Sequence, residues 1–344
     1  MEEKKDKFNP NDVGVANGNY FGLPYHIDDA DIVIVPVPWD ATVSYGKGTA
    51  RGPEAILDAS LQVDLYDEKV PNAWEVKAAS YPVSEELLAL NDSARESAER
   101  VISMLEQGID VPQDNEDIVK VNTLCERMNS YVYEKSSSII SSGKMPVVIG
   151  GEHSVPFGQI KALSEKYGEL GILHLDAHAD LRKAYEGFEY SHASIMYNTM
   201  NKIPSISALV QVGIRDFCSD EAKLVASHPR ICTFTDFRIK ERLFNGLTWR
   251  SICGDIISKL PQNVYVSFDI DALSPEYCPN TGTPVPGGLS FAQADYLLYQ
   301  LSVSGRKIVG FDLNEVAPGA DGEWDANVGA RILFKMLAYF NPGK

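Results

Sequence analysis

The chain has 344 residues, of which 44% are apolar and 23% are charged, and its formal net charge at pH 7 is −17. These proportions are ordinary for a soluble globular protein, and the length suits one large α/β domain or two smaller ones. The acidic excess argues against a nucleic-acid or anionic membrane partner, because phosphate groups are bound by clustered Lys and Arg. It agrees better with a cationic substrate.

Six short apolar runs predict strands, because parallel strands that are covered on both faces read as nearly continuous apolar segments. In chain order these runs are 31–38, 145–151, 171–178, 208–215, 263–271 and 307–316. Between them, apolar periodicity and capping residues such as Ser290 predict helices at 53–60, 118–142, 156–167, 249–260, 290–302 and 327–339. This alternation predicts a three-layer α/β/α fold with a mostly parallel central sheet.

The domain organisation is predicted to be simple. No linker, repeat or low-complexity segment is visible, and the acidic stretch 106–117 is interpreted as a surface loop. We expect an N-terminal extension at 1–30 and a single α/β domain at 31–344.

Cysteine usage and the N-terminal residues indicate a cellular location. The five cysteines contain no C-x-x-C pair, so neither a disulfide framework nor a zinc–thiolate site is indicated. The segment MEEKKDKFNPND lacks the apolar region of a signal peptide, and no run of about 18 apolar residues could span a membrane. We therefore expect a cytoplasmic protein with reduced thiols.

Polar side chains follow four of the predicted strands at their carboxyl ends. They are Glu152, His153 and Ser154 after the second run, Asp176, His178 and Asp180 after the third, Asp269 and Asp271 after the fifth, and Glu315 at the end of the sixth. Open parallel sheets bind ligands in the crevice beyond these ends. The sequence therefore predicts a binding site where the four strands end.

The spacing of these residues predicts metal ligands. Asp176, His178 and Asp180 stand at every second position, and such residues in an extended chain share one face about 6–7 Å apart. Carboxylates and imidazoles suit divalent metals such as Mn, Fe or Zn. With His153, Asp269 and Asp271, the set is too large for one tetrahedral site and fits two metals that share bridging carboxylates.

Each motif taken alone has a simpler interpretation. D-x-H-x-D could be a solvated turn, D-x-D a loop start, and His153 or Ser154 the cap of the next helix. His174, inside an apolar run, is interpreted as a core histidine or one that supports the ligands from behind. The segment GKGTARG at 46–52 resembles a dinucleotide loop, but its glycine spacing differs from G-x-G-x-x-G, so nucleotide binding is not expected. The joint pattern favours the metal site.

Five motifs together resemble the ureohydrolases, also called the arginase/agmatinase family. They are GGEHS at 150–154, DAHADLR at 176–182, YSHAS at 190–194, SFDIDALSP at 267–275 and TGTPVPGGLS at 281–290. The segments 37–56 and 311–318 are similar to the first and last signatures of that family. The resemblance extends from about residue 35 to the C-terminus and implies an arginase-like fold.

The resemblance also implies two Mn²⁺ ions, with other divalent metals possible, and assigns a role to each site residue. One metal would be held by His153, Asp176, Asp180 and Asp269, and the other by Asp176, His178, Asp269 and Asp271. A metal-bridging hydroxide would attack the guanidinium carbon, with Asp180 orienting it, Glu315 pairing with the guanidinium nitrogens and His192 acting as proton shuttle. The products would be urea and a primary amine.

The substrate implied is agmatine, which would give putrescine and place the enzyme in polyamine biosynthesis. The residues after Asp180, LRKAYEGFEYSH, are similar to those of agmatinases rather than to the small polar residues of arginases. Ser274 stands where the family commonly has Asp, KAASYPVSEE replaces an acidic D-L-G-D segment, and GEWDANVGARIL replaces a Thr-Ala-rich helix start. These departures leave open guanidinobutyrate, an aminopropylagmatine-type polyamine precursor, arginine or guanidine.

Two other classes of protein are less favoured. A dinuclear metallophosphoesterase would need G-D-x-H and G-D-x-x-D at strand ends, and no such pair is present there. A non-catalytic family member would be expected to have lost a ligand, and none is lost. The partners expected are a small cationic guanidino substrate and further copies of the chain, with the family implying a homotrimer or hexamer.

Overall fold

The computed structural model describes residues 8–320 and 323–343. Residues 1–7 of the predicted extension, and Gly322 of the segment GEWDANVGARIL, lie outside the described residues. The rest of the extension is part of the fold, since Tyr20, Phe21 and Leu23 are buried in the main core cluster. No helix in the described ranges is long and apolar enough to cross a membrane.

A single eight-stranded sheet in the order β2-β1-β3-β8-β7-β4-β5-β6 forms the middle of the molecule, and every pairing between its strands is parallel. The strands are β1 (Ile32–Val37), β2 (Ala78–Ser80), β3 (Met145–Gly150), β4 (Leu170–Leu175), β5 (Ile206–Val212), β6 (Ile231–Phe234), β7 (Asn263–Asp269) and β8 (Lys307–Asn314). The six predicted strands are all present, while the short edge strands β2 and β6 were not predicted. The parallel sheet confirms the predicted fold class.

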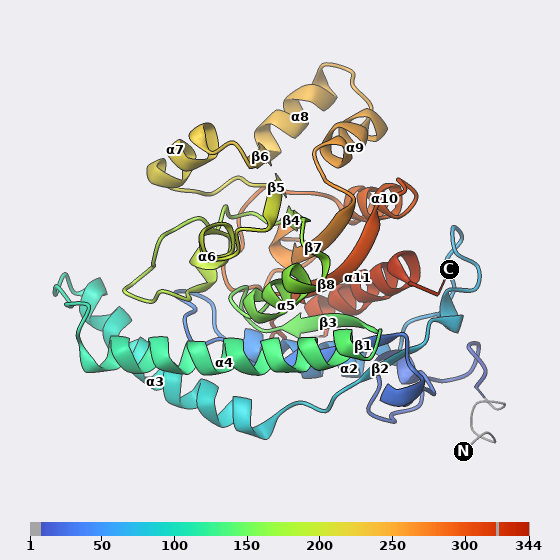
Figure 1. Cartoon of the computed structure of the whole chain (residues 1–344), viewed down its shortest axis with the longest axis horizontal. Coiled ribbons are helices and arrows are strands. Elements are labelled where there is room, and N and C mark those ends of the chain that lie inside the picture. Colours follow the sequence, from blue (N-terminus) through green and yellow to red (C-terminus); the bar gives the residue numbers. More distant parts are fainter. Residues whose placement is uncertain (1–7, 321–322, 344) are drawn as a thin grey trace.

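Two helical layers cover the sheet, which completes the predicted three-layer architecture (Figure 1). One layer contains α3 (Glu85–Glu106), α4 (Glu116–Ser141), α5 (Phe157–Tyr167) and α6 (Ile195–Lys202), which pack in that order. The other contains α2 (Gly52–Ser60), α11 (Trp324–Phe340), α10 (Phe291–Ser302) and α9 (Trp249–Ser258). Two short helices, α7 (Ser219–Ser227) and α8 (Asp236–Phe244), lie beyond β5 near the β6 edge.

Local sequence explains where several helices begin. The Ser290 hydroxyl accepts from the backbone N–H of Gln293, whose side chain in turn accepts from the N–H of Ser290, so the predicted cap of α10 is a complete capping box. The side chains of Ser84 and Asn115 accept from backbone N–H groups in the first turns of α3 and α4, and so cap these two helices. Helix α3 was not predicted, and most of the acidic stretch 106–117 forms the loop that joins it to α4, as interpreted from the sequence.

Candidate metal centre and active site

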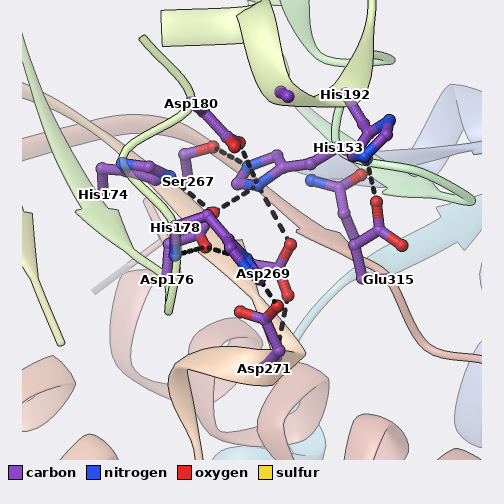
Figure 2. Close-up of polar contacts among 12 residues, drawn as sticks. His153, His174, Asp176, His178, Asp180, His192, Ser267, Asp269, Asp271 and Glu315 are labelled. Carbon is purple, nitrogen blue, oxygen red and sulfur yellow. Dashed lines mark hydrogen bonds and ion pairs between the residues drawn. The ribbon is translucent and has the colours of Figure 1, made fainter. Parts of the chain in front are cut away.

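The four strands predicted to deliver polar residues are neighbours in the sheet. Strands β3, β8, β7 and β4 lie side by side in that order, so their carboxyl ends meet at one place. Figure 2 shows the resulting cluster, in which His153, Asp176, His178, Asp180, Asp269 and Asp271 point toward one another, with Glu315 and His192 beside them. The structure thus brings together every predicted site residue, although the outermost two, His153 and Glu315, are 162 positions apart in the chain.

The first group of potential ligands surrounds His153. Its Nδ1 lies 2.9 Å from Asp176 Oδ2, 3.2 Å from Asp269 Oδ2 and 3.5 Å from Asp180 Oδ2. All four side chains are buried. One imidazole nitrogen therefore faces three carboxylates at one point.

The second group surrounds His178. Its Nδ1 lies 3.0 Å from Asp271 Oδ2 and 3.5 Å from Asp176 Oδ1. Potential ligand atoms of Asp176, His178 and Asp271 all lie within 4.8 Å of one another, as do those of His153, His174, Asp176 and Asp180. Asp176 belongs to both sets, as a bridging carboxylate would.

The backbone does not follow the extended geometry that the spacing predicted. Strand β4 ends at Leu175, and Asp180 has a left-handed backbone with φ of 54°. Asp180 therefore reaches the His153 group through a turn rather than by strict alternation along a strand. A non-glycine residue in this conformation costs energy and is held only where the surroundings determine it.

Electrostatics show that the cluster is deficient in positive charge. Burial and the charge of Asp176 raise the pKa of Asp180 well above its usual range. Burial, Asp271 and Asp176 raise the pKa of Asp269 likewise. Against the opposing effect of burial, His174, His153 and His178 hold the pKa of Asp176 well below its usual range. Buried carboxylates at this density need cations to remain ionised together.

The hydrogen bonds of His153 fit a divalent metal at its Nδ1. Its Nε2 contacts the Ser267 hydroxyl at 2.8 Å, and that hydroxyl donates its only proton to Asp312 Oδ1 at 3.2 Å. Nε2 is therefore the donor in this pair. Nδ1 is directed at the carboxylates, where a metal ion would take the place of a proton. Consistent with this demand for a cation, the buried Asp180 Oδ2 accepts no hydrogen bond from any described residue.

His174 supports the cluster rather than offering a ligand atom to it. The amide nitrogen of Gln211 contacts His174 Nδ1 at 3.1 Å, and His174 Nε2 contacts Asp176 Oδ2 at 2.8 Å. An amide nitrogen can only donate, so the His174 proton lies on Nε2 and is given to Asp176. This contact with Asp176 agrees with the interpretation of His174 as a buried or supporting histidine.

Glu315 stands at the end of β8 with one oxygen available. Its Oε1 accepts from the backbone N–H of His153 at 2.7 Å, and its backbone is left-handed with φ of 63°. A Cβ on Gly282 would stand 3.1 Å from the other oxygen, Oε2, so the glycine keeps the space beside that oxygen open. A planar cation could be held by this carboxylate.

His192 begins the short helical turn His192–Ser194 at the rim of the cluster. The ring of Tyr185 lies edge-on to the His192 imidazole, with 6.3 Å between the ring centroids. The Arg182 guanidinium stacks on the Tyr185 ring, 4.6 Å from its centroid. Removal from water and the positive charge of His178 lower the pKa of His192 to about 3. His192 is therefore a neutral imidazole next to the potential ligands.

Several residues that shape the site were not identified from the sequence. Arg215 follows β5, and its guanidinium donates to the carbonyls of Asp271 at 2.7 Å and Val285 at 2.9 Å. A Cβ on Gly151 would stand 2.0 Å from Trp39 O, so only glycine allows β3 to pass the first-strand loop before His153. Long-range contacts of this kind leave no local sequence signal.

Comparison with known proteins agrees with this geometry. The model of the Arginase family matches residues 30–338. An N(1)-aminopropylagmatine ureohydrolase of Thermus thermophilus is 33% identical over 311 residues, which cover 90% of this chain and 89% of that protein. An agmatinase of Neisseria meningitidis is 32% identical over 319 residues, covering 92% and 88% of the two chains.

Solved structures share the fold. A proclavaminate amidino hydrolase from Streptomyces clavuligerus superposes with a TM-score of 0.73 at 24% identity, covering 96% of this chain and 99% of that one. The agmatine ureohydrolase of Thermoplasma volcanium gives a TM-score of 0.71 at 23% identity, covering 99% and 97%. From the family match and the named relatives, the chain belongs to the arginase family and is a metal-dependent amidinohydrolase.

Proposed function

We propose that the protein hydrolyses the guanidino group of agmatine to urea and putrescine, using two Mn²⁺ ions. The observation that carries this proposal is the position of Glu315, a buried carboxylate with one available oxygen beside two groups of potential ligands that share Asp176. Relatives of similar identity are named agmatinase and N(1)-aminopropylagmatine ureohydrolase. An agmatine extended by an aminopropyl group is therefore the second candidate substrate.

The proposed ligand sets are His153, Asp176, Asp180 and Asp269 for one ion, and Asp176, His178, Asp269 and Asp271 for the other. When bound, such ions supply a water molecule that is acidic enough to attack at neutral pH. The chain's own residues do the rest. Glu315 binds the guanidinium nitrogens and orients the carbon toward the cluster, and Asp180 orients the attacking water through a hydrogen bond.

His192 is proposed to carry the proton that the departing amine needs. Breaking the C–N bond leaves an amine nitrogen that must gain a proton, and a neutral imidazole can take one up and pass it on. The edge-on ring of Tyr185 lies against this imidazole. The loop that follows Asp180 therefore contacts the proposed proton carrier and is the segment expected to select among guanidino substrates.

Urea release from a panel of guanidino compounds tests the proposal. The panel comprises agmatine, N(1)-aminopropylagmatine, guanidinobutyrate, arginine and guanidine, each assayed with protein reconstituted with Mn²⁺, Ni²⁺, Zn²⁺ or Fe²⁺. We expect agmatine to be turned over far faster than arginine. A higher kcat/KM for the aminopropyl compound would select the second candidate, and no urea from any compound with both metals bound would refute the hydrolase assignment. A homotrimer or hexamer in the cytoplasm stays a prediction.

A further inference from the structure

Glu152 is a buried carboxylate that belongs neither to the proposed metal ligands nor, like Glu315, to the proposed substrate-binding residues. It stands directly before His153 and is 0% exposed. Its Oε2 accepts from the backbone N–H of Thr42 at 2.7 Å, and its Oε1 accepts from the Thr42 hydroxyl at 2.8 Å and the Ser154 hydroxyl at 2.6 Å. Glu152 thus accepts hydrogen bonds from both the main chain and the side chain of Thr42, which is itself 0% exposed.

Thr42 in turn contacts His192 at two points. The backbone N–H of His192 donates to the Thr42 hydroxyl oxygen at 3.1 Å, and the same oxygen lies 3.4 Å from His192 Nδ1. Thr42 and His192 are 150 positions apart in the chain. The contact therefore joins the loop after β1, the end of β3 and the turn that carries His192.

The direction of these hydrogen bonds follows from the number of protons and lone pairs on the Thr42 hydroxyl. Threonine has one hydroxyl proton and two lone pairs. The proton is given to Glu152, and one lone pair accepts from the His192 backbone, so the remaining lone pair can only accept at Nδ1. Ser191 Oγ also lies 3.4 Å from Nδ1, but its hydroxyl can donate or accept there, so the direction is decided by the Thr42 oxygen. The imidazole proton is therefore drawn to Nδ1.

We propose that Thr42, held by Glu152, is a positioning residue that fixes His192 in the tautomer with its proton on Nδ1. Nε2 is then the nitrogen that takes up and releases a proton. In the hydrolysis proposed above, on which this role of His192 rests, Nε2 accepts one proton that originates from the attacking water and gives it to the departing amine nitrogen, while Nδ1–H stays in place. The other tautomer would present a donor where an acceptor is needed.

Direct observation of the tautomer tests this assignment without an activity assay. In ¹⁵N-histidine-labelled protein, metal-free and loaded with diamagnetic Zn²⁺, long-range ¹H–¹⁵N spectra distinguish a protonated Nδ1 from a protonated Nε2. The chain has six histidines, and the His192→Ala spectrum identifies the His192 signals. We expect a protonated Nδ1 in the wild type at neutral pH. A protonated Nε2 would overturn the proposal even if no variant folded and no guanidino compound were hydrolysed.

Variants of Thr42 separate positioning from packing. Thr42→Val keeps the shape of the side chain and removes the hydroxyl, and Thr42→Ser keeps the hydroxyl. Thr199→Val is the matched control, because Thr199 is buried in α6 and its hydroxyl has no hydrogen-bond partner among the described residues. Thermal melts and metal content establish that each variant is folded and loaded.

Thr42→Val is expected to lose the Nδ1-protonated pattern and to lower kcat about 10-fold or more, with KM for the active guanidino compound little changed. Thr42→Ser should restore both properties, and Thr199→Val should leave both as in the wild type. An unchanged His192 tautomer in Thr42→Val would overturn the assignment. So would a loss of kcat that is equal in the Ser and Val variants.

Discussion

The amide nitrogen of Gln211 donates to Nδ1 of His174 over 3.1 Å, and this contact places the imidazole proton on Nε2, the nitrogen that faces Asp176. The same amide nitrogen donates to Ala179 O at 2.7 Å, and the side-chain oxygen of Gln211 accepts from the Thr233 hydroxyl at 2.8 Å. Gln211 is therefore fully engaged, and its orientation is not free to reverse. The carboxylate shared by both groups of potential ligands is thus oriented from β5, a strand that supplies none of the predicted ligands.

Gln211→Leu should weaken metal binding without unfolding the protein. Loss of the amide frees His174 to change tautomer, and residues that orient metal ligands typically contribute about 10- to 100-fold in affinity. Competition against a chelating dye measures this. Gln159→Met is the matched control, since Gln159 is also buried and hydrogen-bonded but contacts Pro146 and Tyr265. A control that lost as much metal affinity as Gln211→Leu would contradict the specific role of Gln211.

Asp269→Asn and His192→Ala should separate metal binding from proton transfer. Asp269 lies 3.2 Å from His153 Nδ1, and an amide is a much poorer metal ligand than a carboxylate, so metal content and activity should fall together. His192→Ala should keep both metals and lose about 10²- to 10⁴-fold in kcat, the usual contribution of a general acid–base residue. Metal analysis of dialysed protein and urea release measure the two effects. Full activity in Asp269→Asn would show that the ligand assignment is wrong.

Arg215→Lys should loosen the Asp271 segment although the charge is kept. The guanidinium donates to the carbonyls of Gly213, Asp271, Leu273 and Val285, a set that one ammonium group cannot reproduce. We expect a loss of about 2 kcal/mol in unfolding free energy, corresponding to two or more hydrogen bonds, together with weaker metal binding. Denaturant unfolding and metal titration measure these. Unchanged values in both would exclude a clamping role.

Removal of metal by a chelator should lower the melting temperature substantially. Without cations, the carboxylates around His153 stay buried beside one another, and the raised pKa values of Asp180 and Asp269 record the cost. A ligand that binds only the folded state at 100 times its Kd adds about 2.7 kcal/mol. Calorimetry before chelation, after it and after re-addition of Mn²⁺ checks this. A melting temperature indifferent to all three conditions would mean that no metal binds here.

Asp67→Asn should destabilise the protein in a pH-dependent way. Asp67 is 2% exposed and accepts from Lys335 Nζ at 2.5 Å and from the backbone N–H of Lys69 at 2.8 Å. Burial opposes ionisation, but these contacts keep the pKa of Asp67 below its usual range. Replacing a charged acceptor that makes such hydrogen bonds costs about 1.5–3 kcal/mol.

The sign of this pH dependence follows from the lowered pKa. Because the folded state holds the carboxylate more strongly than the unfolded chain does, Asp67 contributes fully above about pH 4 and loses that contribution as the pH falls further. The stability difference between wild type and Asp67→Asn should therefore shrink in acid. Asp58→Asn, at an exposed position of α2, serves as the control and should differ little from wild type at any pH. A difference that grew in acid would contradict the contacts described.

The site could be predicted because buried parallel strands, and the polar residues that follow them, are easy to recognise in a sequence. Parallel strands covered on both faces are apolar, so a carboxylate or histidine directly after one marks a strand end, and four such ends could be recognised. Their adjacency in the sheet could not, because strand order is a tertiary property. The edge strands β2 and β6, of three and four residues, are too short to give a period. Helix α3 was missed because the middle of its buried face is made of small residues, Asn91, Ala94, Ser97 and Ala98, and its larger apolar residues Leu87, Val101 and Ile102 stand only toward its two ends.

Supporting residues were the least predictable part. Gln211 and Ser267 lie within strands, and Thr42 in a loop, so each reads as an ordinary polar residue in its own segment. The role of each depends on which partner accepts its hydroxyl or amide protons and which of its lone pairs stay available. Those partners come from segments distant in the chain. Glu152 stood in a recognised motif, yet only the structure shows that it is directed at Thr42 rather than at the metal cluster.

The position of β8 sets the order in which the site can form during synthesis. This strand is the last in the chain, yet it lies between β3, which leads to His153, and β7, which leads to Asp269. A nascent chain lacking residues 307–314 would bring His153 and Asp269 together only by pairing β3 with β7 in a sheet that the native protein does not have. The His153 group can therefore be completed only when nearly the whole chain has emerged, whereas Asp176, His178 and Asp271, which follow the directly paired strands β4 and β7, can come together before β8 is made.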